Sequence, residues 1–223
     1  MIKFAVLASG NGSNFQAMID AFQQGRIQAE LVGVISNVPD AYALQRAKNA
    51  GVRQQVIDHR QFEDRESFEA ELINALQSWQ ADVIILAGFM RVLTAGFVDR
   101  FSGQLINIHP SLLPAYKGLH THQRVLNTGD RLHGCTVHFV TQELDAGAAI
   151  AQSVFQVLPT DDVASLKAKV QLLEHELYPH IMAWIAAGRV ALLGCRAYLD
   201  GQPLDQPVRF MHDLPINVPT KIV

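Results

Sequence analysis

Cysteine is scarce in this sequence. Its 223 residues include two cysteines, Cys135 and Cys195, which lie far apart and form no CxxC pair. This spacing excludes a thioredoxin-like redox motif and a zinc knuckle. A single disulfide between the two remains open, but so few thiols favour a reduced protein of the cytoplasm.

Long apolar runs are also missing. The longest, Val83 to Met90, is far shorter than the roughly 20 residues that a membrane-spanning helix needs. The apolar stretch near the N-terminus, Phe4 to Ala8, is too short for the core of a secretory signal. We therefore expect a cytoplasmic protein with no membrane partner.

Neither sign of charge is in large excess. Lys and Arg number 18 and Asp and Glu number 21, so the formal net charge is −3. Nothing in this balance favours nucleic acid as a partner. The hydrophobic fraction of 49% and the charged fraction of 17% are ordinary for a soluble globular protein.

Histidine patterns do not match a metal site. His175 and His180 are five positions apart with Pro179 between them, so they do not share a helical face as a zinc-protease pair does. His120 and His122 have no Cys or acidic residue nearby in sequence, which favours loop packing or a polar substrate contact. We expect no metal.

A glycine-rich turn, Ser-Gly-Asn-Gly-Ser-Asn at residues 9–14, is followed by a helical pattern. A dinucleotide motif built on Gly10 and Gly12 would need Gly or Ala where Phe15 stands, and an acidic residue after the strand that ends at Ser36. We therefore expect no NAD, and the missing Gly-Lys-Ser/Thr excludes a P-loop. Free N–H groups at a helix start suit the phosphate of a smaller ligand. A tight turn without a ligand remains the alternative.

Strand and helix patterns alternate through the first half of the chain. Residues 2–8 are mostly apolar without polar alternation, as in a strand buried on both faces. The expected strands then follow at Leu31–Ser36, Val52–Ile57, Asp82–Ala87 and Leu105–His109, and the expected helices at residues 15–22, at 40–50 with Asp40 as cap, at about 66–79 and at 95–101. This alternation predicts an α/β fold, a Rossmann-like, mostly parallel twisted sheet with helices on both faces.

The pattern changes after Pro114. A short helix is expected at 123–128, and strands at 132–140 and 148–157 are joined by a turn too short for a parallel crossover. They predict an antiparallel C-terminal strand pair. A long helix at 163–187 should be kinked or split by Pro179. The remainder, from Val190 through the Pro-rich tail, is expected to be peripheral.

The end of the 105–109 strand carries candidate catalytic groups. Asn107 and His109 are two positions apart, so they share one face, and Pro110 and Pro114 stop the strand just beyond them. Ligands of open α/β sheets bind at such carboxyl ends. Asp145, in an acidic turn, is the candidate carboxylate to orient His109. The alternatives are a core histidine bound to a backbone carbonyl and a solvated acidic turn.

Six motifs point to a family. They are Ser-Gly-Asn-Gly-Ser-Asn at 9–14, Gly-Phe-Met-Arg at 88–91, Asn-Ile-His-Pro-Ser-Leu-Leu-Pro at 107–114, Gly-Leu-His-Thr-His at 118–122, His-Phe-Val at 138–140 and Leu-Asp at 144–145. In order and spacing they resemble the phosphoribosylglycinamide formyltransferases, which belong to the formyltransferase superfamily. The resemblance covers about residues 2–205.

The resemblance implies a reaction. It implies transfer of the formyl group of 10-formyltetrahydrofolate, a co-substrate, to the amine of glycinamide ribonucleotide, in de novo purine biosynthesis. It implies one domain over residues 1–223, with a nucleotide- or phosphate-binding half at 1–101 and a catalytic and folate-binding half at 102–223. A monomer and a homodimer are both compatible with it.

The resemblance also implies roles for individual residues. The catalytic residues would be Asn107, His109 and Asp145. The ribonucleotide would be bound by Gly12, Ser13, Asn14, Gln171 and Glu174. The folate would be bound by Arg65, Met90, Arg91, Val92, Leu93, Asn107, Thr141, Gln142, Glu143, Leu144 and Asp145. Departures from the family pattern at Leu172, Leu173, Ala115 and Lys117 affect individual contacts.

Other functions are weighed against this one. A formyltetrahydrofolate hydrolase would be expected to carry a further N-terminal module, and a transfer-RNA formyltransferase a C-terminal domain and a basic surface. A nucleotide sensor without catalysis would not need the three residues Asn107, His109 and Asp145. A dehydrogenase fails because the acidic residue that would bind the ribose is missing.

Overall fold

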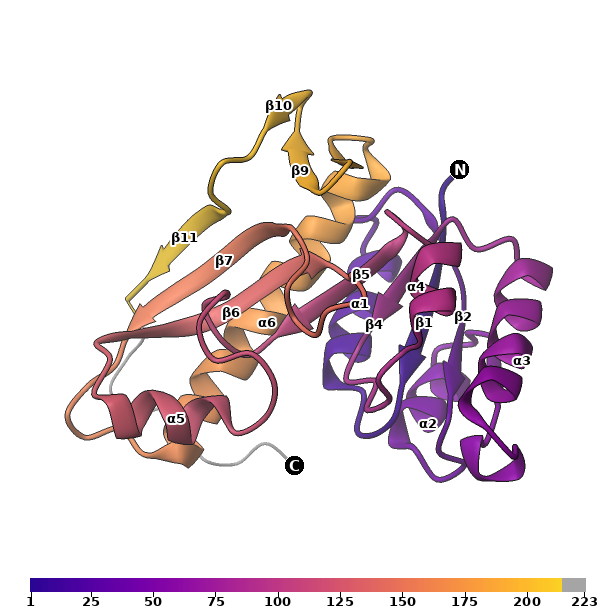
Figure 1. Ribbon diagram of the computed structural model, residues 1–223, viewed down its shortest axis with the longest axis horizontal. Coiled ribbons are helices and arrows are strands. Elements are labelled where there is room, and N and C mark those ends of the chain that lie inside the picture. The colour runs from indigo at the N-terminus through magenta and orange to yellow at the C-terminus, as the bar shows by residue number, and fades with distance from the viewer. Residues whose placement is uncertain (214–223) are drawn as a thin grey trace.

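An eight-stranded sheet crosses the whole molecule in the computed structural model, which describes residues 1–213 (Figure 1). Its strands are β1 (Lys3–Ala8), β2 (Glu30–Ser36), β3 (Gln54–Val56), β4 (Val83–Leu86), β5 (Leu105–His109), β6 (Leu132–Phe139), β7 (Ala149–Gln156) and β11 (Val208–His212). The helices are α1 (Ser13–Gln23), α2 (Tyr42–Asn49), α3 (Arg65–Ser78), α4 (Ala95–Arg100), α5 (Thr121–Thr128) and α6 (Val163–Ala186), with a 3₁₀ turn η1 (His59–Gln61). A small antiparallel sheet contains β8 (Val190–Leu193), β9 (Arg196–Leu199) and β10 (Gln202–Pro203).

The sheet is mostly parallel. Its strand order is β11-β7-β6-β5-β4-β1-β2-β3. Strands β1 to β5 are parallel, β6 is antiparallel to both β5 and β7, and β11 is parallel to β7. The α/β fold class and the antiparallel strand pair are therefore confirmed. The order reverses at β1, so the loops after β1 and β4 meet at the kind of crevice where open α/β sheets bind ligands.

Both faces of β1 are buried, as its apolar run predicts. Phe4, Val6 and Ala8 belong to the core on the α1, α2 and α6 side. Ala5 and Leu7 belong to the core on the α3 and α4 side. In Figure 1, α6 runs along one face of β6 and β7 and extends that first core under the antiparallel strands. The central strands are thus rigidly held, and their carboxyl ends form a fixed platform.

The structure corrects the expected start of α2. Asp40 does not cap this helix, because the N-cap is Ala41 and no side chain bonds to the first turn. The backbone N–H of Ala43 instead donates to the carbonyl oxygen of Gly10 at 3.1 Å. The Gly10 carbonyl therefore takes the place of a side-chain cap, and this hydrogen bond joins the glycine-rich turn to α2.

Pro179 does not split the long helix. The helix is continuous from Val163 to Ala186. Pro179 is buried, as are Tyr178 and Ile181 beside it. Packing of this face against the sheet outweighs the backbone hydrogen bond that proline removes.

The expected peripheral tail contains a strand of the main sheet. β11 pairs with β7 in parallel, and Phe210 packs against His180 and Trp184 of α6 with ring centroids 5.5 and 6.2 Å apart. The expectation for residues 208–212 was therefore wrong, because the pairing that orders them is remote in sequence. The end of that tail, residues 214–223, lies outside the described residues.

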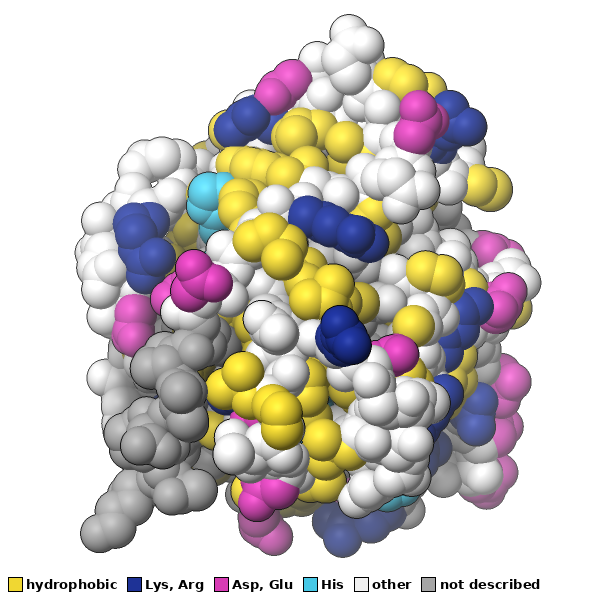
Figure 2. Space-filling view, turned by 90° about the vertical axis from the view of Figure 1, so that its left-hand side faces the viewer, with side chains coloured by type: hydrophobic (Ala, Val, Ile, Leu, Met, Phe, Trp, Pro, Cys, Tyr) yellow, Lys and Arg dark blue, Asp and Glu magenta, His cyan; other side chains and the backbone are white. Residues whose placement is uncertain are grey.

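No helix within residues 1–213 is long and apolar enough to span a bilayer. Cys135 is buried, Cys195 is exposed, and both are free thiols. On the face shown in Figure 2, acidic and basic side chains are interspersed around a band of hydrophobic ones. This face carries no extended field of one charge.

Candidate active site

Two loops predicted to bind different substrates are joined by Ser9, at the point where the strand order reverses. The backbone N–H of Ser9 donates to the carbonyl oxygen of Gly88 at 3.1 Å. Its hydroxyl accepts from the N–H of Met90 at 2.8 Å and donates to Asn37 Oδ1 at 2.6 Å. Ser9 therefore fixes the loop after β4 relative to the glycine-rich turn.

Ser9→Ala is expected to raise the KM for a formyl-folate by about tenfold. The substitution leaves the Met90 N–H and the buried Asn37 without their hydroxyl partner, a loss on the order of 1–3 kcal/mol that loosens the folate-side loop. Steady-state kinetics with each substrate varied in turn would measure it. Ser78→Ala, on the far end of α3, is the control. An unchanged KM in Ser9→Ala would show that this bond does not shape the loop.

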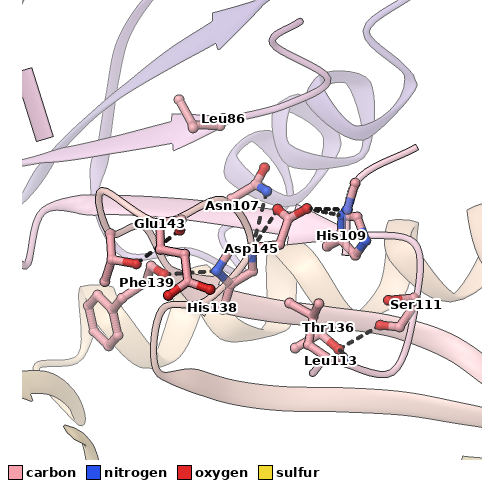
Figure 3. Close-up of polar contacts among 12 residues, drawn as sticks. Leu86, Asn107, His109, Ser111, Leu113, Thr136, His138, Phe139, Glu143 and Asp145 are labelled. Atoms are coloured by element: carbon pink, nitrogen blue, oxygen red, sulfur yellow. Dashed lines mark hydrogen bonds and ion pairs between the residues drawn. The ribbon is translucent and has the colours of Figure 1, made fainter. Parts of the chain in front are cut away.

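Asn107, His109 and Asp145 are brought together at the end of β5 (Figure 3). His109 Nδ1 lies 3.3 Å from Asp145 Oδ2, and both side chains are almost fully buried. His109 Nε2 lies 2.9 Å from the carbonyl oxygen of Tyr116. Because a carbonyl only accepts, Nε2 carries a proton, and the carboxylate faces the other ring nitrogen. This arrangement suits a doubly protonated imidazolium.

Asp145 is itself held by residues 115–120, the part of the β5–α5 connection that we call the covering loop. The backbone N–H of Gly118 donates to Asp145 Oδ2 at 2.9 Å, the same oxygen that faces His109. Asp145 adopts a positive φ of 50°, which Asp and Asn tolerate better than most residues. The covering loop therefore contacts both members of the His109–Asp145 pair, through Tyr116 and Gly118.

His138 orients the amide of Asn107, a role that no sequence pattern indicated. His138 Nδ1 lies 2.8 Å from the carbonyl oxygen of Phe139, so this nitrogen is the donor. Burial lowers the pKa of His138 to about 4, so the ring is neutral at pH 7 and Nε2 is an acceptor. Asn107 Nδ2 lies 3.2 Å from that Nε2. One amide N–H is thereby used, and the second is left for another acceptor.

The loop base after β5 is anchored on the antiparallel strands. Thr136 Oγ1 donates to the carbonyl oxygen of Ser111 at 2.6 Å and accepts from the N–H of Leu113 at 3.0 Å. Gln152 Nε2 donates to the carbonyl oxygen of Leu113 at 2.8 Å. These buried contacts hold the chain just beyond His109, so the proline-bounded exit is a fixed base for the covering loop.

A cavity of about 680 Å³ opens beside these residues, a size typical of a small-molecule site. The predicted folate residues that line it are Met90, Arg91, Val92, Leu93, Asn107, Thr141, Gln142, Leu144 and Asp145. Two do not: Arg65 lies exposed at the start of α3, and Glu143 points to solvent, paired with Lys117 at 2.8 Å. The lining residues that sequence reasoning did not assign include Leu119, Val163 and Lys167.

The five predicted ribonucleotide residues also meet in space. Gln171 Nε2 donates to Ser13 Oγ at 2.8 Å, and Asn14 Nδ2 donates to Glu174 Oε2 at 2.9 Å. Gly12 is the N-cap of α1, and no side chain caps the first-turn N–H groups. The N-terminus of α1, facing α6, therefore has the properties of an anion site with polar groups beside it.

Glu174 has an unusual protonation equilibrium. Burial raises its pKa to about 7, and the hydrogen bond from Asn14 opposes that shift. Near neutral pH the carboxyl group is therefore present in both protonation states. Such a group is suited to contact an amine that exchanges a proton.

Half-buried His122, which lines the cavity, pairs with buried His133, with His122 Nδ1 2.9 Å from His133 Nε2. Burial is the main cause that lowers their pKa values, to about 4 and about 3. Lys167 and His109 disfavour charge on His122, whereas Asp130 favours it on His133. No group of three or more His, Cys, Asp or Glu is placed to hold a metal within residues 1–213.

Acid is expected to destabilise the fold through this pair. Both pKa values are lower in the folded chain than the usual 6.5, so the unfolded chain binds more protons below pH 6.5 and stability falls there, by at most about 1.4 kcal/mol per pH unit for each histidine. Urea unfolding at pH 7.5 and 5.5 measures the loss. His122→Gln/His133→Gln should flatten the dependence, whereas His212→Gln should not. If stability depended on pH as steeply in the double variant as in wild type, His122 and His133 would not be the cause of the acid destabilisation.

Comparison with known proteins identifies the family of this chain. The family model described as formyl transferase matches residues 2–182. A phosphoribosylglycinamide formyltransferase of Escherichia coli (strain K12) is 45% identical over 203 residues, which cover 91% of this chain and 96% of that protein. This chain belongs to the phosphoribosylglycinamide formyltransferase branch of the formyl transferase family.

Solved structures of this branch share the fold. A phosphoribosylglycinamide formyltransferase of Coxiella burnetii, in complex with CHES, superposes with a TM-score of 0.91 at 45% identity, over 94% of this chain and 99% of that one. A glycinamide ribonucleotide transformylase of Symbiobacterium toebii gives 0.86 at 40% identity, over 89% and 94%. The Homo sapiens trifunctional purine biosynthetic protein adenosine-3 is 41% identical over 85% of this chain, which spans 19% of that protein.

Proposed function

We propose that this chain transfers the formyl group of 10-formyltetrahydrofolate to the amine of glycinamide ribonucleotide, in de novo purine biosynthesis. The observation that carries the proposal is the group of Asn107, His109 and Asp145, the last two with almost fully buried side chains, at a cavity of about 680 Å³. Identity of 45% to the E. coli phosphoribosylglycinamide formyltransferase, over nearly the whole of both chains, supports it.

Asn107 and His109 stabilise the charge that develops on the formyl oxygen. Attack of a neutral amine on the formyl carbon creates an oxyanion and an ammonium group. The free N–H of Asn107 donates to that oxyanion, and the protonated ring of His109 donates beside it. His109 Nε2 is bound to the Tyr116 carbonyl here, so use of that proton requires the substrate to displace the carbonyl.

One proton has to move for the reaction to balance. The C–N bond to the amine forms, the bond from the formyl carbon to folate N10 breaks, and a proton passes from the amine nitrogen to N10. In this proposal the His109–Asp145 pair relays that proton, and the 3.3 Å separation of Nδ1 and Oδ2 at the cavity supports this role. Glu174, whose pKa is raised to about 7 by burial, accepts a proton from the incoming ammonium form of the amine.

Each substrate has its own part of the chain in this proposal. The α1 N-terminus with Gln171 and Glu174 binds the ribonucleotide, and the cavity beside residues 90–93 and 141–145 binds the folate. We keep the proposal of one domain with halves 1–101 and 102–223, and each substrate draws on both halves: α6 contributes to the ribonucleotide part and residues 90–93 to the folate part. We further propose a cytoplasmic enzyme that needs neither metal nor NAD, either a monomer or a homodimer.

An ultraviolet assay with a 10-formyl-folate analogue tests the function. Deformylation should require glycinamide ribonucleotide. It should yield the deformylated folate analogue and N-formylglycinamide ribonucleotide in equal amounts. Deformylation at the same rate without the amine would make the chain a hydrolase. No reaction, with binding of the ribonucleotide retained, would make it a sensor.

A further inference from the structure

Glu69 places a carboxyl group in the apolar core that α3 and α4 form on one face of the sheet (Figure 1). This core includes Phe68 and Leu72 of α3 and Phe97 of α4. Glu69 is 3% exposed, and within residues 1–213 no Lys, Arg or His forms an ion pair with it. A buried carboxyl group costs folding free energy unless hydrogen bonds satisfy it, so the partners of Glu69 indicate what it does.

Both carboxyl oxygens of Glu69 bind Thr94, the last residue of the connection between β4 and α4. The backbone N–H of Thr94 donates to Glu69 Oε1 at 2.8 Å, and the Thr94 hydroxyl donates to Oε2. The same hydroxyl accepts from the N–H of Phe97 at 3.3 Å and so caps α4. Glu69 therefore fixes the N–H and the hydroxyl of the residue at which the chain enters α4.

The connection itself, residues 87–94, is the folate-side loop. Within residues 1–213, the backbone of residues 91–93 forms no hydrogen bond, and these three residues line the cavity together with Met90. The start of the loop is held by Ser9, which binds Gly88 and Met90. Its end is held by Glu69 through Thr94. The course of the loop along the cavity is therefore set at its two ends.

We propose that Glu69 is a positioning residue for the formyl-folate. It does not line the cavity, and it acts through Thr94 on the loop that does. Capping of α4 does not by itself require Glu69, because a threonine hydroxyl can cap a helix unaided. The proposal rests on the proposed function, since that function assigns the cavity to the folate. It adds to the site a buried residue of α3 that no sequence motif indicated.

Kinetics of Glu69→Leu test the proposal. Leucine fills the space in the core and removes both acceptors, so the Thr94 N–H loses its partner and the end of the loop is released. The KM for the formyl-folate should rise about 10- to 100-fold, while kcat and the KM for glycinamide ribonucleotide stay within about threefold. Glu69→Gln should stay within about threefold throughout, because its amide can bind both groups of Thr94. Glu71→Leu, at an exposed position of the same helix, is the matched control.

Thr94→Val tests whether Glu69 acts through Thr94. Valine keeps the shape and the N–H and removes the hydroxyl, so the KM for the formyl-folate should rise about 3- to 10-fold. In the Glu69→Leu background the same substitution should change this KM by less than about twofold, because the hydroxyl has already lost its acceptor. Effects that multiply in full would show that the two residues act separately and would overturn the proposal.

Two further results would overturn it. One is an unchanged KM for the formyl-folate in folded Glu69→Leu, and the other is an equal rise in the KM of both substrates. If Glu69→Leu does not fold, Thr94→Val decides, and an unchanged KM for the formyl-folate in that variant would overturn the proposal. Wild type that binds a 10-formyl-folate analogue in calorimetry without formylating the ribonucleotide would refute the proposed function instead. The dissociation constants of wild type and the Glu69 variants for that analogue would then still test the role of Glu69.

Discussion

His109→Ala is expected to lower kcat by about three orders of magnitude, with the fold retained. The substitution removes one donor to the oxyanion and the group that carries the proton, effects that are each typically worth about 10²–10⁴-fold in other enzymes. Because the two losses share one residue, they do not multiply in full. Stopped-flow and steady-state assays measure the rate, and KM for both substrates should change little.

Asp145→Asn is expected to lower kcat about as much as His109→Ala does. Asparagine fits the backbone here, because it tolerates the positive φ of 50° at this position, and it keeps a partner for the Gly118 N–H. What it removes is the negative charge that faces His109 Nδ1 at 3.3 Å. Glu143→Gln is the matched control, since Glu143 lies in the same turn, faces solvent and does not line the cavity.

Circular dichroism and thermal unfolding should show that His109→Ala, Asp145→Asn and Glu143→Gln are all folded. Turnover of His109→Ala or Asp145→Asn within about tenfold of wild type would contradict the mechanism. A loss in Glu143→Gln equal to that in Asp145→Asn would mean that the turn as a whole matters, and not the carboxylate beside His109.

The sequence predicted the parts of the site that depend on local rules. The two-residue period of a strand placed Asn107 and His109 on one face, and both line the cavity. The acidic turn was expected at the same edge of the sheet, and Asp145 lies there against His109. The parallel first half of the sheet followed from the strand–helix alternation. In each case the signal is contained in a short window of residues.

Features that depend on contacts remote in sequence could not be predicted this way. His138 orients Asn107 because the two are cross-strand partners on β5 and β6, a register that no local pattern specifies. β11 is a strand only because β7 offers it a free edge. The Gly10 carbonyl replaces Asp40 as the cap of α2. The packing of α6 likewise overrides the local effect of its proline.

Gly12→Ala is expected to destabilise the fold and to weaken ribonucleotide binding strongly. Gly12 has a φ of 73°, in the left-handed region, where a Cβ costs roughly 1–2 kcal/mol. That Cβ would also lie 2.7 Å from the Cβ of Ala43, and such overpacking typically costs about 1–3 kcal/mol. The combined loss is about 2–5 kcal/mol. Relief of the clash would displace the α1 N-terminus, so the KM for the ribonucleotide should rise at least about tenfold.

Gly10 in the same turn provides the matched control. A Cβ there would meet nothing within 4 Å, and Gly10 is not among the glycines with positive φ. Gly10→Ala should therefore stay within about 1 kcal/mol of wild type, because an alanine that fits also restricts the unfolded chain. Urea unfolding and ribonucleotide KM of the two variants make the comparison. Equal changes in unfolding free energy and KM for Gly10→Ala and Gly12→Ala would contradict this prediction. They would show that the contact between Gly12 and α2 does not set the shape of the site.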